Sequence, residues 1–221
     1  MKISEIFKSI QGEGNSVGTP ALFIRTFGCN LRCKWCDSKY SYEEPPTELS
    51  TEELSAKIKR AGLERIVITG GEPLLQIDAL LELFRFLPNM TIVEIETNGT
   101  IDPQPLLNCD KPLIFFNVSP KLQNSGVEFK DRINFEILSK FAELSQSIFK
   151  FVVEDEKDIV EIGMIQRGAK IQNHQIYLMP QARTVDEYIE KAKWTVSKCL
   201  EMGWNFSPRE HLVIWGGERG K

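Results

Sequence analysis

The sequence predicts an α/β fold, an incomplete (β/α) TIM-like barrel with about six parallel core strands. Short runs of β-branched and aromatic residues alternate with amphipathic stretches, an order that builds parallel sheets. The chain has 221 residues, whereas a complete eight-unit barrel typically has ~250. The sequence shows no internal repeat, low-complexity segment or long linker. We therefore expect residues 1–221 to form a single domain.

The expected strands are distributed along most of the chain. The first six are short runs rich in Ile, Val and Leu, and most of them also contain Phe or Tyr. A seventh run, from His211 to Trp215, has a similar composition. The seven strands are expected at residues 21–26, 65–69, 91–97, 113–118, 148–153, 175–179 and 211–215.

Amphipathic stretches between these strands predict the helices. The first helix should begin after Ser50, because serine is a favoured N-cap. Glu52 and Glu53 then lie in its first turn, where they suit the positive end of the helix dipole. The five helices are expected at residues 51–61, 77–87, 134–144, 156–166 and 185–202.

Polar segments that contain glycine or proline follow several expected strands. In parallel α/β folds, functional residues gather at the carboxyl ends of the strands. We therefore expect the functional site at this edge of the sheet. The segments are Thr69-Gly70-Gly71-Glu72-Pro73, Glu96-Thr97-Asn98-Gly99-Thr100, Ser119-Pro120-Lys121 and Met179-Pro180-Gln181.

Charge and composition exclude several classes of protein. A net charge of -4 argues against a nonspecific nucleic-acid binder, which would be basic. No apolar run reaches membrane-spanning length, and the N-terminus lacks the apolar region of a signal peptide. We expect a cytoplasmic protein that binds neither nucleic acid nor membrane. The five cysteines then favour metal binding over disulfides, although Cys109 and Cys199 are best explained as small buried hydrophobic residues.

Cys29, Cys33 and Cys36 have the spacing C-x3-C-x2-C. Three thiolates from one short loop can hold three corners of a cubane [4Fe–4S] cluster and leave the fourth iron open. Structural zinc sites and electron-transfer clusters instead close their coordination with a fourth protein ligand. The alternative is a zinc site completed by His174 or His211, but neither histidine lies at zinc-finger spacing.

The cysteine loop, with Trp35 before its last cysteine, resembles the signature of the radical S-adenosylmethionine (SAM) superfamily, and Gly70-Gly71-Glu72-Pro73 resembles its GGEP segment. The resemblance implies a partial barrel of the radical SAM type, in which SAM chelates the open iron. Reductive cleavage of SAM, with electrons from a donor such as a flavodoxin or ferredoxin, then gives a 5′-deoxyadenosyl radical, while the protein binds and orients the reactants. The SAM contacts that it implies are Trp35, Gly71, Glu72, Glu96, Asn98, Ser119, Pro120, Lys121 and Gln181.

A narrower resemblance begins at Gln11-Gly12-Glu13-Gly14 and extends through Arg25, Cys36-Asp37-Ser38 and the strand-end segments. The first half of the chain closely resembles the 7-carboxy-7-deazaguanine synthase family, and the second half does so loosely. The resemblance implies a homodimeric lyase of queuosine biosynthesis that converts 6-carboxy-5,6,7,8-tetrahydropterin to 7-carboxy-7-deazaguanine. Hydrogen abstraction at C6 starts the reaction, ammonia is released, and SAM is regenerated.

The same resemblance implies roles for particular residues. Arg25 suits a substrate carboxylate, which a guanidinium can hold bidentately, although a salt bridge is its ordinary explanation. The hydroxyl of Ser38 is implied as a ligand of Mg²⁺, which accepts few protein oxygens together with substrate and water. No acid–base catalyst is assigned. The implied substrate contacts are Ile10, Gln11, Gly12, Glu13, Arg25, Thr69 and Lys221.

Two other functions remain open at this point. A radical SAM activating enzyme, which makes a glycyl radical on a protein partner, would use the same cysteine loop. Gln11–Gly14, Arg25 and Ser38 favour a small carboxylated substrate instead. An iron–sulfur or zinc module without catalysis would leave the polar segments at the strand ends unexplained.

Overall fold

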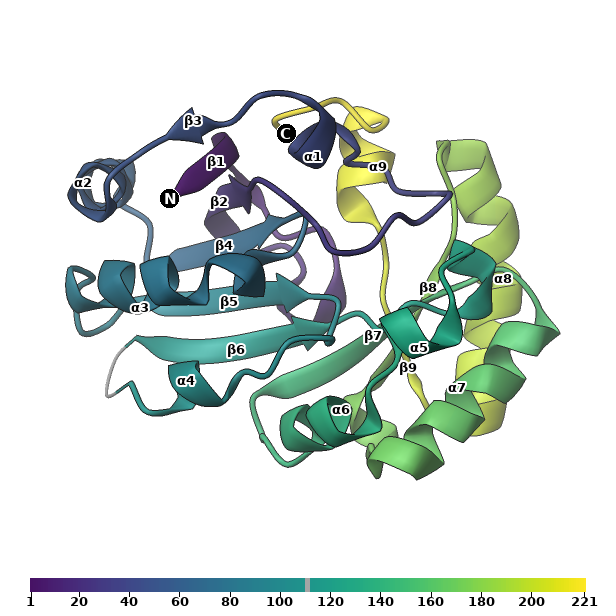
Figure 1. Ribbon diagram of the computed structural model, residues 1–221. Coiled ribbons are helices and arrows are strands. Elements are labelled where there is room, and N and C mark those ends of the chain that lie inside the picture. Colours follow the sequence, from purple (N-terminus) through teal and green to yellow (C-terminus); the bar gives the residue numbers. More distant parts are fainter. Residues whose placement is uncertain (110–111) are drawn as a thin grey trace.

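The computed structural model describes residues 1–109 and 112–221. In these residues a single open sheet runs through the molecule (Figure 1), and its strands are parallel from β2 to β9, whereas β1 pairs antiparallel with both β2 and β3. The α/β fold with a parallel core that the sequence predicts is thus confirmed, and the antiparallel pairs of β1 make the sheet a mixed one. In spatial order the strands are β3 (Thr47–Glu48), β1 (Lys2–Ile10), β2 (Pro20–Thr26), β4 (Arg65–Gly70), β5 (Ile92–Thr97), β6 (Leu113–Val118), β7 (Ser147–Val153), β8 (Ile176–Pro180) and β9 (Asn205–Phe206).

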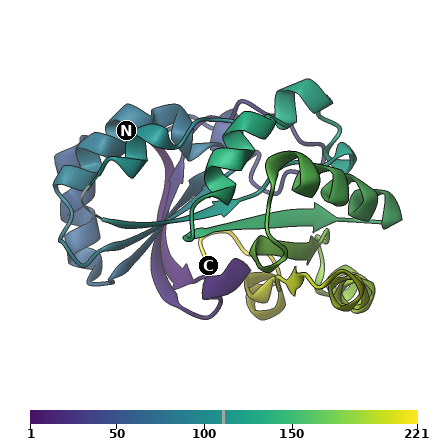
Figure 2. The ribbon, with the colours of Figure 1, turned by 90° about the horizontal axis from the view of Figure 1, so that it is seen from below.

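Helices join the parallel strands, and most of them cover one face of the sheet, while the C-terminal end lies on the other side (Figure 2). Four of them, α2, α3, α7 and α8, begin at the residue that the sequence predicts. Ser50 and Glu53 cap α2 reciprocally, and Thr184 caps α8. The helices are α1 (Tyr40–Glu43), α2 (Thr51–Ala61), α3 (Ile77–Arg85), α4 (Gln104–Leu107), α5 (Phe129–Arg132), α6 (Phe135–Ala142), α7 (Glu156–Ala169), α8 (Val185–Met202) and α9 (Glu210–Trp215), and the 3₁₀ turns are η1 (Gly14–Ser16), η2 (Pro73–Gln76), η3 (Gln123–Ser125) and η4 (Asn173–Gln175).

One expected strand is wrong. Residues 211–215 form the helix α9 instead. Its β-branched residues Val213 and Ile214 are 44% and 53% exposed, and only Leu212 is buried. A strand there would need a neighbouring strand for its backbone, whereas a helix satisfies its own hydrogen bonds. The strands β1, β3 and β9 were not predicted.

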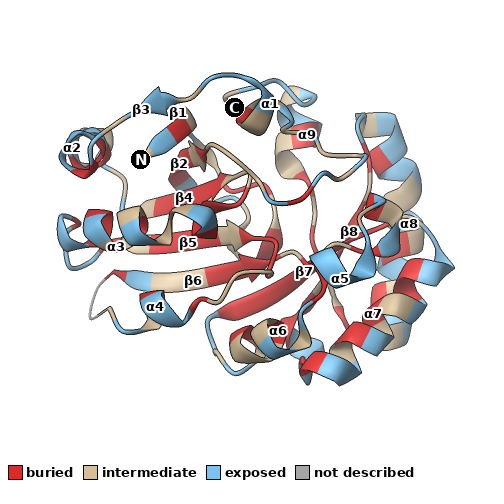
Figure 3. Cartoon of the chain, in the orientation of Figure 1, coloured by how far each residue is buried: buried red, intermediate tan, exposed pale blue. Residues whose placement is uncertain are grey.

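The alternation of side chains along each strand separates a core from a functional face. Residues such as Ile24, Ile68, Ile95, Phe116 and Phe149 are buried under the helices (Figure 3). Each such side chain contributes roughly 1.5–3 kcal/mol of hydrophobic stabilisation. The neighbouring positions therefore point to the opposite, concave face. In the described residues no helix combines the length and apolarity that crossing a membrane requires.

Candidate active site

The concave face carries a row of polar side chains from adjacent strands. Arg25 of β2 pairs in register with Thr69 of β4, and Glu96 of β5 with Asn117 of β6. A cavity of about 510 Å³ opens above this row, between the carboxyl ends of the strands, the cysteine loop and the C-terminal segment. Its position confirms that the strand ends gather at one site, as expected for this fold.

Most residues that the sequence singled out line this cavity. Glu72 and Pro120 are not among its lining residues. Those that line it are Ile10, Gln11, Gly12, Glu13, Arg25, Cys29, Cys33, Trp35, Cys36, Ser38, Thr69, Gly71, Glu96, Asn98, Ser119, Lys121, Gln181 and Lys221.

The cysteine loop follows β2 directly and is fixed by its backbone. Gly28 N–H donates to Ser41 O at 2.8 Å, and Lys34 N–H donates to Ser125 O at 2.8 Å. Burial raises the pKa of the Cys29 and Cys33 thiols. Ligation by a metal would therefore have to displace their protons, as it does in cysteine-ligated sites.

The three thiols fit a cluster better than a single ion. In residues 1–109 and 112–221 no three His, Cys, Asp or Glu side chains converge as a single metal ion would require. The cysteines of a cubane bind separate irons, so they need not converge on one point. All three line the same cavity, and His211, which could complete a zinc site, lies with its Nε2 3.7 Å from Glu13 Oε1. Ser38 Oγ lies 3.8 Å from Cys36 Sγ.

Gly71 lets the end of β4 pack against the cysteine loop. A Cβ at this position would lie 1.9 Å from Gly28 O, a backbone atom, and 2.9 Å from Cys29 Cβ. The adjacent Glu72 N–H donates to Gly28 O at 2.8 Å. The glycine is thus required for contact between two parts of the chain itself. The loop that carries the cysteines and the loop after β4 form one unit.

Glu72 organises this unit from below the cavity. It is fully buried and accepts hydrogen bonds from Asn98 N–H at 2.7 Å, Thr97 Oγ1 at 2.8 Å and Leu74 N–H at 3.0 Å. Burial raises its pKa, while these hydrogen bonds act in the opposite direction. Its oxygens are therefore engaged inside the protein. The structure shows Glu72 joining the loops after β4 and β5, and the SAM contact that the resemblance implies for it stays a prediction.

Lys121 and Ser119 approach the cysteine loop from the end of β6. Lys121 Nζ donates to Ser119 Oγ at 2.9 Å and lies 5.6 Å from the centre of the Trp35 ring. Trp35 Nε1 in turn donates to Asn124 Oδ1 at 3.1 Å. Gln181 also lines the cavity, and its backbone oxygen accepts a hydrogen bond from Lys191 Nζ at 2.7 Å. This end of the cavity offers an ammonium, hydroxyls and an amide around the cysteines.

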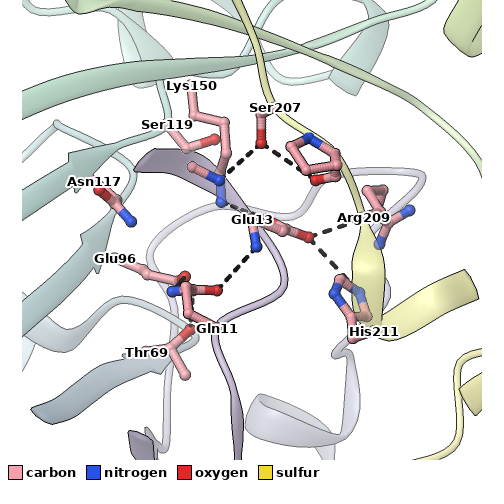
Figure 4. Close-up of polar contacts among 12 residues, drawn as sticks. Gln11, Glu13, Thr69, Glu96, Asn117, Ser119, Lys150, Ser207, Arg209 and His211 are labelled. Atoms are coloured by element: carbon pink, nitrogen blue, oxygen red, sulfur yellow. Dashed lines mark hydrogen bonds and ion pairs between the residues drawn. The ribbon is translucent and has the colours of Figure 1, made fainter. Parts of the chain in front are cut away.

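The other end of the cavity is built on buried carboxylates. Gln11 Nε2 donates to Glu94 Oε1 at 2.6 Å and to Glu96 Oε1 at 3.1 Å. Thr69 Oγ1 donates to Glu96 Oε2 at 2.8 Å, and Asn117 Nδ2 donates to Glu94 Oε1 at 2.5 Å. Burial is the main reason that the pKa of Glu94 is raised. The network fixes the turn after β1 against the row of polar side chains (Figure 4).

Sequence reasoning missed the partners of Glu13. Figure 4 shows Glu13 between Lys150 on one side and Arg209 and His211 on the other. Glu13 Oε2 forms an ion pair with Lys150 Nζ, and Glu13 Oε1 lies 3.5 Å from Arg209 Nε. Arg209 NH2 also pairs with Asp37 Oδ2 at 2.9 Å. One feature of the sequence indicates that Lys150 is functional, its position between two phenylalanines of an expected strand. None indicates a role for Arg209, which the tertiary structure brings to the site.

Arg25 lies beside the C-terminal segment. Its Nε donates to Glu5 Oε2 at 3.3 Å, and its terminal nitrogens have no hydrogen-bond partner in the described part of the chain. Residues 217–221, which include Lys221, line the cavity as well. The Arg25 side chain is 17% exposed. It is therefore held at one nitrogen and available to a ligand at the other two.

Comparisons with known proteins agree on one family. A model of the radical SAM superfamily matches residues 23–137. The chain is 36% identical to the 7-carboxy-7-deazaguanine synthase of Pyrobaculum aerophilum, and the match covers 100% of the chain and 97% of that protein. It is 34% identical to the 7-carboxy-7-deazaguanine synthase of Rhodopirellula baltica over 99% of the chain and 88% of that protein. The crystal structure of QueE from Escherichia coli superimposes with a TM-score of 0.69 and 29% identity, covering 93% of this chain and 92% of that one.

Proposed function

The chain belongs to the 7-carboxy-7-deazaguanine synthase family of the radical SAM superfamily, and we propose that it acts in the synthesis of the queuosine precursor by this family's reaction. The substrate would be 6-carboxy-5,6,7,8-tetrahydropterin and the product 7-carboxy-7-deazaguanine, with release of ammonia. One observation carries the proposal. A single cavity holds three cysteines at one end and, at the other, the half-buried carboxylates Glu13 and Glu96 beside an arginine whose terminal nitrogens have no hydrogen-bond partner in the described residues.

Cys29, Cys33 and Cys36 would hold the [4Fe–4S] cluster, and the open side of the cysteine loop faces the cavity. When bound, the cluster and SAM supply the radical chemistry that starts the reaction at the substrate. Lys121 and Ser119 would bind the carboxylate and hydroxyl groups of SAM. Gly71 and Asn98 present backbone and amide groups beside them. Pro120 would shape this turn without lining the cavity.

The other end of the cavity would bind the pterin. The free nitrogens of Arg25 can hold the substrate carboxylate bidentately. The 2-amino-4-oxopyrimidine edge of a pterin carries N–H donors beside an oxygen acceptor. Glu96 and the backbone at Ile10 and Gly12 line the cavity and offer matching groups. Lys150 and Arg209 keep Glu13 ionised, so that Glu13 can accept hydrogen bonds but not donate them.

Further requirements of the reaction follow from the family. Ser38 would supply a hydroxyl to Mg²⁺, whose other ligands would come from the substrate and water. A flavodoxin or ferredoxin would deliver electrons to the cluster. We further propose that the chain works as a homodimer in the cytoplasm.

An anaerobic assay tests the function directly. The reconstituted protein is mixed with a reductant, SAM and 6-carboxytetrahydropterin, with and without Mg²⁺. We expect 7-carboxy-7-deazaguanine to form over many turnovers without net consumption of SAM. Stoichiometric consumption of SAM, no product, and a radical transferred to a protein partner would instead identify an activating enzyme.

A further inference from the structure

Glu5 of β1 connects two parts of the cavity that are far apart in the sequence. Its carboxylate accepts from Arg25 Nε and from Tyr40 Oη, each at 3.3 Å, through Oε2. Its other oxygen, Oε1, accepts from Arg219 Nε at 3.0 Å. The side chain is 14% exposed. A single half-buried carboxylate thus binds both a cavity arginine and the C-terminal segment.

The contact with Glu5 decides which atoms of Arg25 face a ligand. A guanidinium presents five N–H groups in a rigid planar fork. Arg25 Nε donates a hydrogen bond to Glu5, which does not line the cavity. This hydrogen bond fixes the plane of the guanidinium. In residues 1–109 and 112–221 the terminal nitrogens have no hydrogen-bond partner, and the Arg25 Cζ lies 5.7 Å from the centre of the Tyr40 ring. They are therefore oriented before a carboxylate arrives, which lowers the entropy lost on binding.

The contact with Arg219 holds the C-terminal segment in place. Arg219 Cζ lies 3.9 Å from the centre of the Tyr40 ring, and its NH1 lies 3.1 Å from Glu44 Oε2. Gly216 and Gly217, with φ of 62° and 83°, turn the chain after α9. Residues 217–221 consequently line the cavity beside Arg25, and the C-terminal end lies next to α1 in Figure 1.

We propose that Glu5 is a positioning residue: it orients Arg25 toward the substrate carboxylate and, through Arg219, holds the C-terminal segment across the cavity. The inference rests on the proposed function, because it takes Arg25 as the carboxylate ligand. Glu5 does not touch the substrate. Its charge is balanced by the two arginines that it bonds, so it does not repel an anionic ligand.

Ligand binding by cluster-free protein tests this role without any turnover. Two probes are titrated: 6-carboxypterin, and pterin, which lacks the carboxylate. Wild type should prefer 6-carboxypterin, and Arg25→Ala should abolish that preference. Glu5→Gln keeps the size of the side chain but removes its charge. We expect this variant to lower the affinity for 6-carboxypterin about tenfold, which is the lower range for the loss of a charge-assisted hydrogen bond. Its affinity for pterin should be unchanged.

Glu43→Gln provides the matched control, because Glu43 is an exposed residue of α1 and the same chemical change there should preserve the preference. Hydrogen exchange reports on the second part of the proposal. In Glu5→Gln the amides of residues 216–221 should exchange faster than in wild type, whereas those of α7 should not. A thermal melt establishes that each variant is folded, and Glu5→Asp, which keeps the charge on a shorter side chain, should weaken 6-carboxypterin as well.

Different results would overturn different statements. If Glu5→Gln weakens the binding of both probes equally, or weakens the binding of neither, the proposed positioning of Arg25 is refuted. Unchanged exchange in residues 216–221 would refute the hold on the C-terminal segment. If wild type shows no preference for 6-carboxypterin, or Arg25→Ala retains it, the proposed carboxylate contact itself is wrong.

Discussion

Glu13 and Lys150 form a largely buried ion pair, in which the Lys150 side chain is 6% and the Glu13 side chain 15% exposed, although 137 positions separate them in the sequence. Burial acts to raise the pKa of Glu13, but the surrounding charges, above all Lys150, hold it well below its ordinary value of 4.5. Burial acts to lower the pKa of Lys150, but Glu13 and Glu96 raise it above its ordinary value of 10.5. The pair therefore stabilises the fold between pH 4.5 and 10.5. It is lost as the pH falls through the folded pKa of Glu13 or rises through that of Lys150.

Lys150→Met should destabilise the protein strongly at neutral pH, because it leaves Glu13 buried with less compensating charge. Breaking a buried pair in this way costs about 3–5 kcal/mol. Below about pH 4.5 the loss should shrink, since Glu13 in the variant can take up a proton. Denaturant unfolding at pH 7 and pH 4 measures both values. Lys150→Arg keeps the charge and should recover part of the stability; an equal loss from Lys150→Met at both pH values would contradict this account.

Gly71→Ala should destabilise the unit formed by the cysteine loop and the loop after β4. Its Cβ would lie 1.9 Å from a backbone oxygen, and relieving such overpacking costs typically 1–3 kcal/mol. We expect a lower melting temperature and less iron bound after reconstitution. Gly163→Ala is the control, because in α7 its Cβ would meet only Arg167 NH1, at 3.5 Å, and alanine favours a helix. A melting temperature that falls equally in both variants would speak against the contact.

Cys29→Ala, Cys33→Ala and Cys36→Ala should each abolish turnover. Anaerobic reconstitution of wild type should give about four irons per chain and a spectral change on addition of SAM. Each variant should lose both signals. Cys109→Ala should retain them, and their loss in that variant would place Cys109 in the site. Stoichiometric zinc without a response to SAM would refute the cluster.

Ser38→Ala should remove the stimulation of activity by Mg²⁺, whereas Ser38→Thr, which keeps the hydroxyl, should preserve it. The reason is that Mg²⁺ strongly prefers oxygen ligands. Initial rates across a series of Mg²⁺ concentrations give the comparison. Binding of 6-carboxypterin to the metal-free protein should be the same in all three proteins. An unchanged Mg²⁺ dependence in Ser38→Ala would rule out this hydroxyl as a ligand.

Most of the fold could be predicted from the sequence because the local signals and the tertiary structure agree. The six parallel strands from β2 to β8 combine β-branched composition with burial on the helix-covered face. Helix α2 has a capping box that can be read directly from Ser50 and Glu53. Residues 211–215 had the composition of a strand, but their surroundings bury only Leu212. Local composition does not encode which neighbour a segment will meet.

The candidate site, like the fold, could be predicted only in part from the sequence. Residues within contiguous motifs, such as the cysteines and Gly71, could be identified because the chemistry requires their spacing. Glu94 and Lys150 were missed because each lies between apolar residues in the middle of a strand, outside any motif. Alternation would have placed both on the concave face. Arg209 lines the cavity beside Glu13, and Glu5 reaches it through Arg25 and Arg219. The spacing of residues along the sequence does not reveal these contacts.

The turn at Gly12–Gly14 has a consequence for how the protein is made. Gly14 N–H donates to Ser207 Oγ, 193 positions later, and Gly12 O accepts from Glu210 N–H at 2.9 Å. Contacts of such separation form late, because a long loop must close first. On the ribosome, where synthesis proceeds from the N-terminus, the cysteine loop and its neighbours in β2, β4 and β5 emerge long before residue 207. In a nascent chain, the cysteine loop is therefore made before the residues that anchor the Gly12–Gly14 turn, Ser207 and Glu210, are present.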